Sequence, residues 1–213
     1  MLMFSHDRFT IASSRLDFTR NLWDRQGREL QTQLEHTDKV LSVFFSPDRE
    51  IIATASNRTV KLWNKQGQEL KTLSGHTNEV LSVSFSPDRE TIATASADNT
   101  VRLWNYQGQE LQFIPGHTDK VWSVNFSPDG EIISTASSDN MVKLWDRQGR
   151  ELQTLQGHKE SVRSVSFSPD GQTIASASND SNVILWNFDL TNLINKSCDW
   201  LSDYMTNPTT PPE

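Results

Sequence analysis

Cysteine is nearly absent from this sequence, since Cys198 is the only one among 213 residues. A lone cysteine forms neither an intramolecular disulfide nor a cysteine-based metal cluster, and this usage is typical of a reducing compartment. Long apolar runs are also missing, because no stretch of about 18 residues is apolar enough for a transmembrane helix. The opening MLMFSHDRFT has no positively charged segment before an apolar run, so we expect no secretory signal. These absences favour a cytoplasmic protein with no membrane association.

Basic residues are scarce relative to acidic ones. The chain has 20 lysines and arginines against 27 aspartates and glutamates, and its net charge is −7. Proteins that bind nucleic acid concentrate positive charge to neutralise phosphates. Here the basic residues are spread along the chain, so we expect no nucleic-acid partner.

The sequence contains an internal repeat with a period of about 40 residues. Histidines recur at the same interval as tryptophans, and the spacing from each repeated tryptophan to the next histidine is constant along the chain. The repeated residues are Trp23, Trp63, Trp104, Trp145 and Trp186, with His36, His76, His117 and His158. Recurrence at a fixed spacing predicts a repeat architecture.

Each period has the pattern of strands, because short β-branched and aromatic runs alternate with turn-forming residues. In the third period we expect strands at 80–86, 91–96, 100–105 and 109–114, with a turn at Pro87-Asp88 and a tight turn at Asp98-Asn99. A single four-stranded sheet does not bury enough apolar surface and needs neighbouring sheets on its faces. Radial stacking of such sheets is a propeller.

The repeated motifs resemble those of the WD-repeat (WD40) family, and within it the bacterial members of cyanobacterial type. A GH pair, an SPDG turn, a D-x-T-V-x-L-W-D/N strand and a G-x-E-L strand recur over residues 36–187, and a weaker copy covers 1–35. The tail NFDLTNLINKSCDWLSDYMTNP is also similar to tails in that group. The resemblance implies an all-β, WD40-type β-propeller array of about five four-stranded antiparallel blades, with the G-x-E-L strand outermost.

The motifs divide the chain into blades and a tail. We expect a degenerate or truncated blade at 1–35 and an incomplete final blade at 158–187, which lacks a G-x-E-L segment. The complete blades between them and the tail segments are expected at 36–75, 76–116 and 117–157, with an amphipathic helix at 188–206 and a disordered end at 207–213. The helix is expected either to cap the last blade or to dock on another domain or chain.

The unequal ends favour the C-terminal portion of a longer parent protein, and they leave three arrangements open. These are a strained five-blade ring, an open arc capped by its tail, and an arc that pairs with another chain. Because an unpaired strand edge is adhesive, self-association through open blade edges is expected.

Histidine, a hydroxyl residue, aspartate and tryptophan recur together in the third to fifth repeats. The family resemblance implies that each set forms a buried hydrogen-bonded tetrad rather than a catalytic triad, which would occur once in a single cleft. The expected tetrads are His76, Ser96, Asp98 and Trp104; His117, Ser137, Asp139 and Trp145; and His158, Ser178, Asp180 and Trp186, with Thr94, Thr135 and Ser176 as alternatives for the hydroxyl. No catalytic residue, metal site or cofactor is expected.

The first two repeats depart from this pattern. In the second, the turn is one residue shorter, Asn57 replaces the aspartate, and Glu35 replaces the glycine before His36. In the first, Arg15 and Arg20 stand at positions that face the core elsewhere, where a buried charge is costly.

The sequence favours a non-catalytic scaffold for protein–protein interaction, since no Gly-rich phosphate loop and no nucleophile elbow is present. The alternative is a C-terminal sensor or regulatory propeller of a larger signalling protein, such as a kinase or an ATPase. The resemblance places the partner-binding rim at the start of the inner strands and just before the turn aspartate. These positions are Lys39, Leu41, Glu79, Leu81, Ala97, Lys120, Trp122, Ser138, Arg163 and Asn179. Trp122 is singled out because exposed tryptophan is enriched at binding hot spots.

Overall fold

The structure is a computed structural model that describes residues 2–4, 10–14, 19–24, 26, 28–34 and 40–188. Before Val40 the description covers the backbone alone, apart from Gln26 and Arg28. The described chain is all-β and forms five antiparallel sheets. This confirms the expected fold class, whereas the predicted C-terminal helix lies outside the described residues. No helix in the described ranges is long and apolar enough to cross a membrane.

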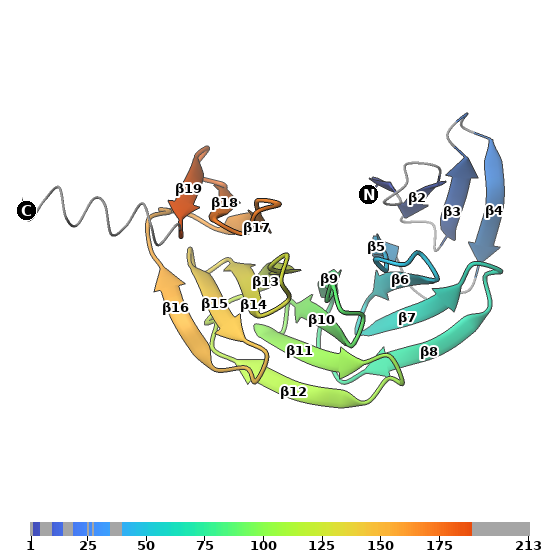
Figure 1. Cartoon of the computed structure of the whole chain (residues 1–213), viewed down its shortest axis with the longest axis horizontal. Helices are drawn as coiled ribbons and strands as arrows, with labels where there is room; N and C mark the ends of the chain where they lie inside the picture. Colours follow the sequence, from blue (N-terminus) through green and yellow to red (C-terminus); the bar gives the residue numbers. More distant parts are fainter. Residues whose placement is uncertain are drawn as a thin grey trace, which may run out of the picture.

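The sheets follow one another along an arc, with the first and last sheets at its two ends (Figure 1). The innermost strands are β1 (Leu2–Phe4), β5 (Val40–Phe45), β9 (Val80–Phe85), β13 (Val121–Phe126) and β17 (Val162–Phe167). The second strands are β2 (Thr10–Ser14), β6 (Ile51–Ser56), β10 (Thr91–Ser96), β14 (Ile132–Ser137) and β18 (Thr173–Ser178).

The third strands carry the repeated tryptophan, and the fourth strands lie on the outside of the arc. The third strands are β3 (Thr19–Asp24), β7 (Thr59–Asn64), β11 (Thr100–Asn105), β15 (Val142–Asp146) and β19 (Val183–Asn187). The fourth strands are β4 (Glu29–Leu34), β8 (Glu69–Ser74), β12 (Glu110–Pro115) and β16 (Glu151–Leu155). In the described part of the last sheet, β19 is the edge, so this sheet has three strands as expected.

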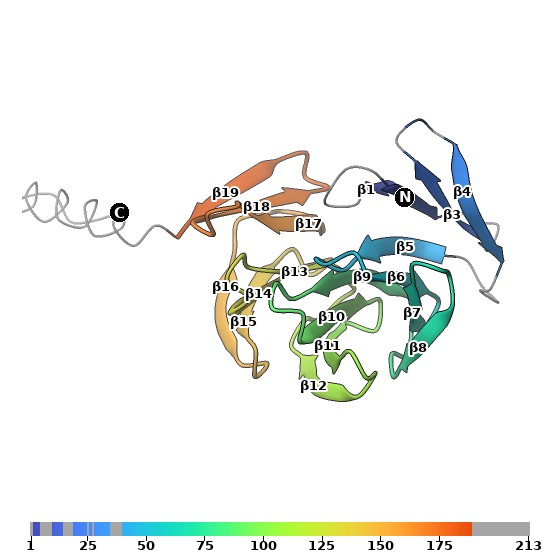
Figure 2. The same ribbon diagram turned by 45° about the vertical axis from the view of Figure 1, so that its right-hand side comes forward.

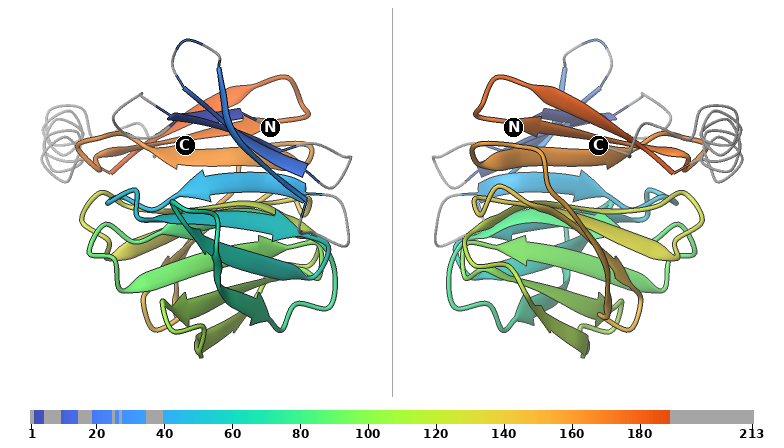
Figure 3. Two further views of the ribbon diagram at one scale, coloured as in Figure 1. Left: turned by 90° about the vertical axis from the view of Figure 1, so that its right-hand side faces the viewer. Right: turned by 90° about the vertical axis from the view of Figure 1, so that its left-hand side faces the viewer.

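Each sheet is strongly twisted. The inner strands run along the axis of the arc and the outer strands are tilted to it, as the oblique and side views show (Figures 2 and 3). Strands of L-residues have an inherent right-handed twist. Side-chain hydrogen bonds also link neighbouring inner strands: the Val124 N–H donates to Ser82 Oγ at 3.3 Å, and Asn125 Nδ2 donates to the Val165 carbonyl at 2.6 Å.

The apolar core lies between consecutive sheets. One cluster joins Val60, Leu62 and Leu73 of the second sheet to Val80 and Ile92 of the third, and equivalent clusters join the third to the fourth and the fourth to the fifth. Fully burying one such side chain stabilises the fold by roughly 1.5–3 kcal/mol. Because each cluster needs two sheets, a sheet depends on its neighbour for much of its stability.

The SPD turn after the inner strand is closed by its own side chains in the second to fifth sheets. In the third repeat Ser86 Oγ donates to Asp88 at 2.5 Å, and the Thr91 N–H donates to Ser86 Oγ at 2.9 Å. The residue after the aspartate has a positive φ, 64° at Arg89 and 78° at Gly130. Glycine adopts this conformation without steric cost, which explains the SPDG form of the motif.

Candidate functional site

A buried relay of hydrogen bonds connects four side chains in the third sheet. The Trp104 indole N–H donates to Thr94 Oγ1 at 2.9 Å, and Thr94 Oγ1 lies 2.8 Å from His76 Nε2. On the other side of the ring, His76 Nδ1 lies 2.9 Å from Asp98 Oδ2. A carboxylate only accepts and an indole only donates, so these partners fit a neutral imidazole with its proton on Nδ1.

The same relay recurs in the next two sheets. In the fourth sheet it joins Trp145, Thr135, His117 and Asp139, with distances of 2.9, 2.7 and 2.8 Å along the chain of contacts. In the fifth sheet it joins Trp186, Ser176, His158 and Asp180, with distances of 2.9, 2.8 and 3.0 Å.

The carboxylate at the end of each relay is held in its charged form. Burial favours the neutral form of Asp98, but hydrogen bonds from Thr100, the Thr77 N–H and His76 outweigh it and lower the pKa to about 2. Burial likewise opposes the charge of Asp139, yet hydrogen bonds led by that from His117 lower its pKa to about 2. Burial lowers the pKa of His76, which agrees with a neutral ring.

The relay has the connectivity of a hydrolase triad, but its hydroxyl has no access to a substrate. A nucleophilic hydroxyl must reach a substrate, whereas Thr94 is fully buried and its oxygen already accepts the Trp104 indole N–H. Three equivalent copies in neighbouring sheets also argue for a structural element. The relay therefore links two parts of the blade: the turn that contains Asp98 and the strand that contains Trp104.

A second polar cluster is partly exposed at the start of the inner strands. The Arg163 guanidinium carbon lies 4.0 Å from the centroid of the Trp122 ring, and Arg163 Nε donates to Asn179 Oδ1 at 3.0 Å. The Trp122 indole N–H donates to Ser138 Oγ at 2.6 Å. Trp122 is half-buried and Arg163 is exposed. Two neighbouring sheets thus hold a stacked tryptophan–arginine pair in one position.

The other predicted rim residues that the structure describes form no such cluster. Leu41 and Leu81 are half-buried at the positions that Trp122 and Arg163 occupy in later repeats, and Glu79 and Lys120 are exposed. Ala97 is buried, and Lys39 lies outside the described residues. The structure therefore brings together four of the predicted rim residues, namely Trp122, Ser138, Arg163 and Asn179.

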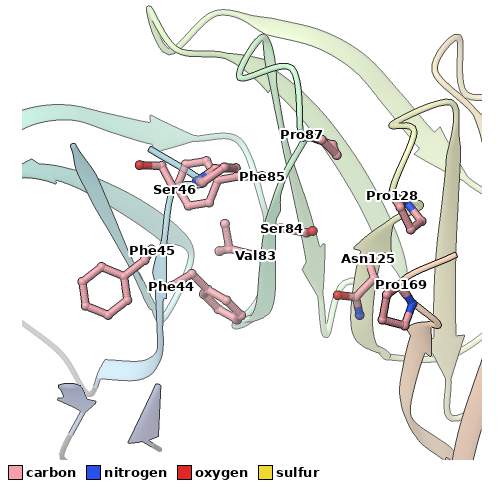
Figure 4. A pocket seen from close by; sticks show the side chains of 11 residues that line it. Phe44, Phe45, Ser46, Val83, Ser84, Phe85, Pro87, Asn125, Pro128 and Pro169 are labelled. Carbon is pink, nitrogen blue, oxygen red and sulfur yellow. The ribbon is translucent and has the colours of Figure 1, made fainter. Parts of the chain in front are cut away.

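A hollow of about 610 Å³ lies at the opposite end of the inner strands. Figure 4 shows Phe44, Val83 and Asn125 of three inner strands on its wall, with Pro87 and Pro128 of the turns that follow. Among the described residues that line it there is no acid, base or thiol. This hollow offers apolar surface but no group for acid–base or nucleophilic chemistry.

The repeats match the family model described as WD domain, G-beta repeat, over residues 27–64, 67–105, 108–146 and 149–187. The chain belongs to the WD40 family. WD40 domains are protein-interaction scaffolds and the family is generally non-catalytic. The matches begin at residue 27, after the first three strands of the first sheet. A search of curated protein sequences gives no match.

The first choice of hydroxyl for each WD40 tetrad was wrong, and the alternatives Thr94, Thr135 and Ser176 are the ones that contact the histidines. Ser96, Ser137 and Ser178 do not contact the histidines; their hydroxyls donate to the carbonyls of Glu79, Asp119 and Glu160 respectively, each at 2.9 Å. Ser96 is the last residue of β10, and its hydroxyl also accepts the Asp98 N–H at 3.1 Å, so it binds the turn and the preceding loop, whereas Thr94 lies further into the sheet and reaches His76. Ser137 and Ser178 occupy the equivalent positions in their sheets.

The departures in the first two WD40 repeats are only partly described. In the second sheet the Trp63 indole N–H donates to Thr54 Oγ1 at 2.7 Å, as in the complete tetrads. Asn57 is half-buried, and its carbonyl accepts the Val80 N–H at 2.6 Å, so it contributes to the contact with the third sheet. His36, Arg15 and the side chain of Arg20 lie outside the described residues.

One recurrent contact had not been expected. A basic residue of the third strand pairs with the glutamate of the G-x-E-L strand, as in Lys61–Glu69 at 2.6 Å, Arg102–Glu110 and Lys143–Glu151 at 2.7 Å. The recurrence of both charges in the repeat is the sequence signal that could have predicted this ion pair.

Within the described chain, no group of three or more His, Cys, Asp or Glu residues is arranged to hold a metal ion.

Proposed function

We propose that this chain is a non-catalytic scaffold that binds a protein partner at the rim formed by Trp122, Ser138, Arg163 and Asn179. The stacked Trp122–Arg163 pair is the observation that carries the proposal. Tryptophan and arginine are the residue types most enriched at interaction hot spots. A pair that is already held in place loses less conformational entropy on binding than two free side chains do.

The alternative surfaces support a partner less well. The outer strands expose Leu70, Leu111 and Leu152, each beside a charged residue of its own strand. They also expose Phe113, but the Arg102 guanidinium over its ring is already paired with Glu110. The tetrads are buried and serve the fold. The rim is the exposed place where two sheets position a tryptophan and an arginine together.

Site-specific photo-crosslinking tests the proposal. A benzophenone side chain is placed at Leu81, which occupies the rim position of the third sheet, or at Leu111 on the outer strand as the matched control. We expect a crosslinked protein from cell extract at position 81 only. Excess wild-type chain should prevent crosslinking, whereas the Trp122→Ala/Arg163→Ala double variant should not. Equal crosslinking from both positions, or equal competition by the double variant, would contradict binding at the rim.

A further inference from the structure

Arg163 is held from two sides before any partner arrives. Its guanidinium lies over the Trp122 ring, and its Nε is engaged by Asn179. Trp122 is fixed in turn by Ser138. Stacking on an aromatic face and a hydrogen bond at Nε leave the two terminal amino groups of a guanidinium on its outer edge. These groups form the planar fork that binds a carboxylate through two parallel hydrogen bonds.

The fork has no acidic partner within the described part of the chain. Other arginines have one: Arg102 pairs with Glu110, Arg147 with Asp88 at 2.6 Å and Arg150 with Asp146 at 2.5 Å. Arg163 is exposed, and the described residues place no carboxylate within ion-pair distance of it. A positioned guanidinium that has no counter-ion among the described residues is therefore suited to bind a carboxylate from a partner.

The neighbouring rim positions are apolar. Leu41, Leu81 and Trp122 occupy the same place on three consecutive inner strands, and Arg163 occupies it on the next. All three apolar residues are half-buried, so part of each side chain faces solvent. The rim thus presents an apolar strip that ends at the stacked Arg163, with Glu79 and Lys120 exposed beside the strip.

Resting on the proposed function, we infer that the partner segment is a peptide with an aspartate or glutamate that binds Arg163 and an apolar side chain nearby that contacts Trp122. A carboxylate fits better than a phosphate group. A phosphate carries nearly two negative charges, and it would meet a single positioned arginine on a chain of net charge −7. One guanidinium fork matches one carboxylate in both shape and charge.

Affinity selection with peptide libraries tests this inference. The probes are four degenerate decapeptide libraries in which one central residue is fixed as glutamate, glutamine, phosphoserine or lysine. On the wild-type chain we expect the glutamate library to be retained at least about tenfold more than the glutamine library, as for a charge-assisted hydrogen bond. Arg163→Gln should abolish that preference while keeping selection for apolar residues, and Arg163→Lys should reduce it. Arg150→Gln, an exposed arginine on a distant turn, is the matched control and should change nothing.

The outcomes separate this inference from the proposed function. Two outcomes would overturn the inference and leave rim binding in place. One is retention with no preference for glutamate over glutamine, and the other is stronger retention of the phosphoserine library. A glutamate preference that survives Arg163→Gln would assign recognition to another residue and overturn the inference. If no library is retained and the crosslinking at position 81 also fails, the rim itself is the wrong surface.

Discussion

The third and the last sheets have similar sequences over their first three strands, but they do not have the same environment. Val101 and Leu103 of the third sheet are each 1% exposed, whereas the equivalent Val183 and Leu185 are 66% and 69% exposed. The tetrads of the two sheets are nevertheless the same to within 0.1 Å in each distance. The relay is therefore a property of one blade, whereas apolar burial is a property of two neighbouring blades.

The edge strands of the two sheets differ in charge as well. Arg102 of the third sheet pairs with Glu110 of β12, but the equivalent position in β19 is Ile184. An apolar residue replaces the basic one in the sheet where the described chain has no outer strand. The last sheet thus repeats the parts of the motif that act within a blade, and it lacks the pair that ties β11 to an outer strand.

The tryptophans should give the largest difference between the two sheets. Trp104 is buried between the second and third sheets, and Trp104→Ala should lower the free energy of unfolding by roughly 3–5 kcal/mol, as for other large aromatic deletions. Trp186 is half-buried, so Trp186→Ala should cost clearly less. Urea denaturation followed by circular dichroism measures both. Equal losses would show that the last sheet is covered as well as the third.

Leu103 and Leu185 take no part in the relay, so their substitution tests only the burial of apolar side chains against a neighbouring sheet. Leu103→Ala should lower the free energy of unfolding by roughly 2–5 kcal/mol, the range for buried leucines. Leu185→Ala should change it by less than about 1 kcal/mol, because the side chain is already exposed to solvent. The same denaturation experiment decides. A loss at Leu185 as large as that at Leu103 would mean that this face is covered in solution.

Acid should weaken the relays of both sheets. The pKa of Asp98 is lowered from 3.8 to about 2 in the folded chain, so the folded state binds this proton less readily than the unfolded state does. Its contribution of about 2 kcal/mol is therefore complete above pH 5 and is lost as the pH falls from about 4 to 2. The backbone N–H of Lys159 likewise lowers the pKa of Asp180, so the last sheet should show loss of the same sign. Unfolding measured at pH 7, 5 and 3 tests this, and Asp98→Asn should remove the part that belongs to Asp98. Stability that rises toward pH 3 would contradict it.

The histidines should not distinguish the two sheets. His76→Ala and His158→Ala each remove the centre of an equivalent relay and leave a buried hydroxyl and a carboxylate with one hydrogen bond fewer. We expect each to lower the free energy of unfolding by roughly 1–3 kcal/mol. Matched losses would support a relay that acts within one blade. A His158 effect near zero would mean that the relay also depends on a neighbouring sheet.

The exposed face of the last sheet should promote weak association between chains. Apolar side chains and an unpaired strand edge are adhesive surfaces, and β19 has exposed apolar side chains and, within residues 40–188, no strand paired to its outer edge. We expect concentration-dependent association in light scattering, weakened at least about tenfold (about 1.4 kcal/mol) by Val183→Lys/Leu185→Lys. Leu152→Lys on the outer strand β16 is the matched control and should have little effect. A chain that stays monomeric over the whole concentration range would contradict this expectation.

Local pattern predicted the strands well. The expected strands at 91–96 and 100–105 have the observed bounds, while the first strand ends one residue earlier than expected and the outer strand is shifted by one residue. The hydroxyl of the tetrad could not be assigned, because Thr94 and Ser96 share one face of β10 and the position of the His76 ring, set by tertiary structure, decides between them. The Trp122–Arg163 contact crosses two sheets, so no pattern within a repeat contains it. Whether the side chains of Val183 and Leu185 are buried depends on an adjoining sheet, so the sequence of the repeat does not predict it.

Contact between consecutive sheets also has a consequence for how the gene can change. The same positions form the contact at each step from the second sheet to the fifth, and from the third to the fifth sheet they recur at the constant interval of the sequence repeat. Tandem duplication of one such unit would insert a sheet whose two faces already match those of its new neighbours. Deletion of one unit would bring two compatible faces together. Recombination between repeats can therefore change the number of blades in one step, without any point mutation to repair the new contact.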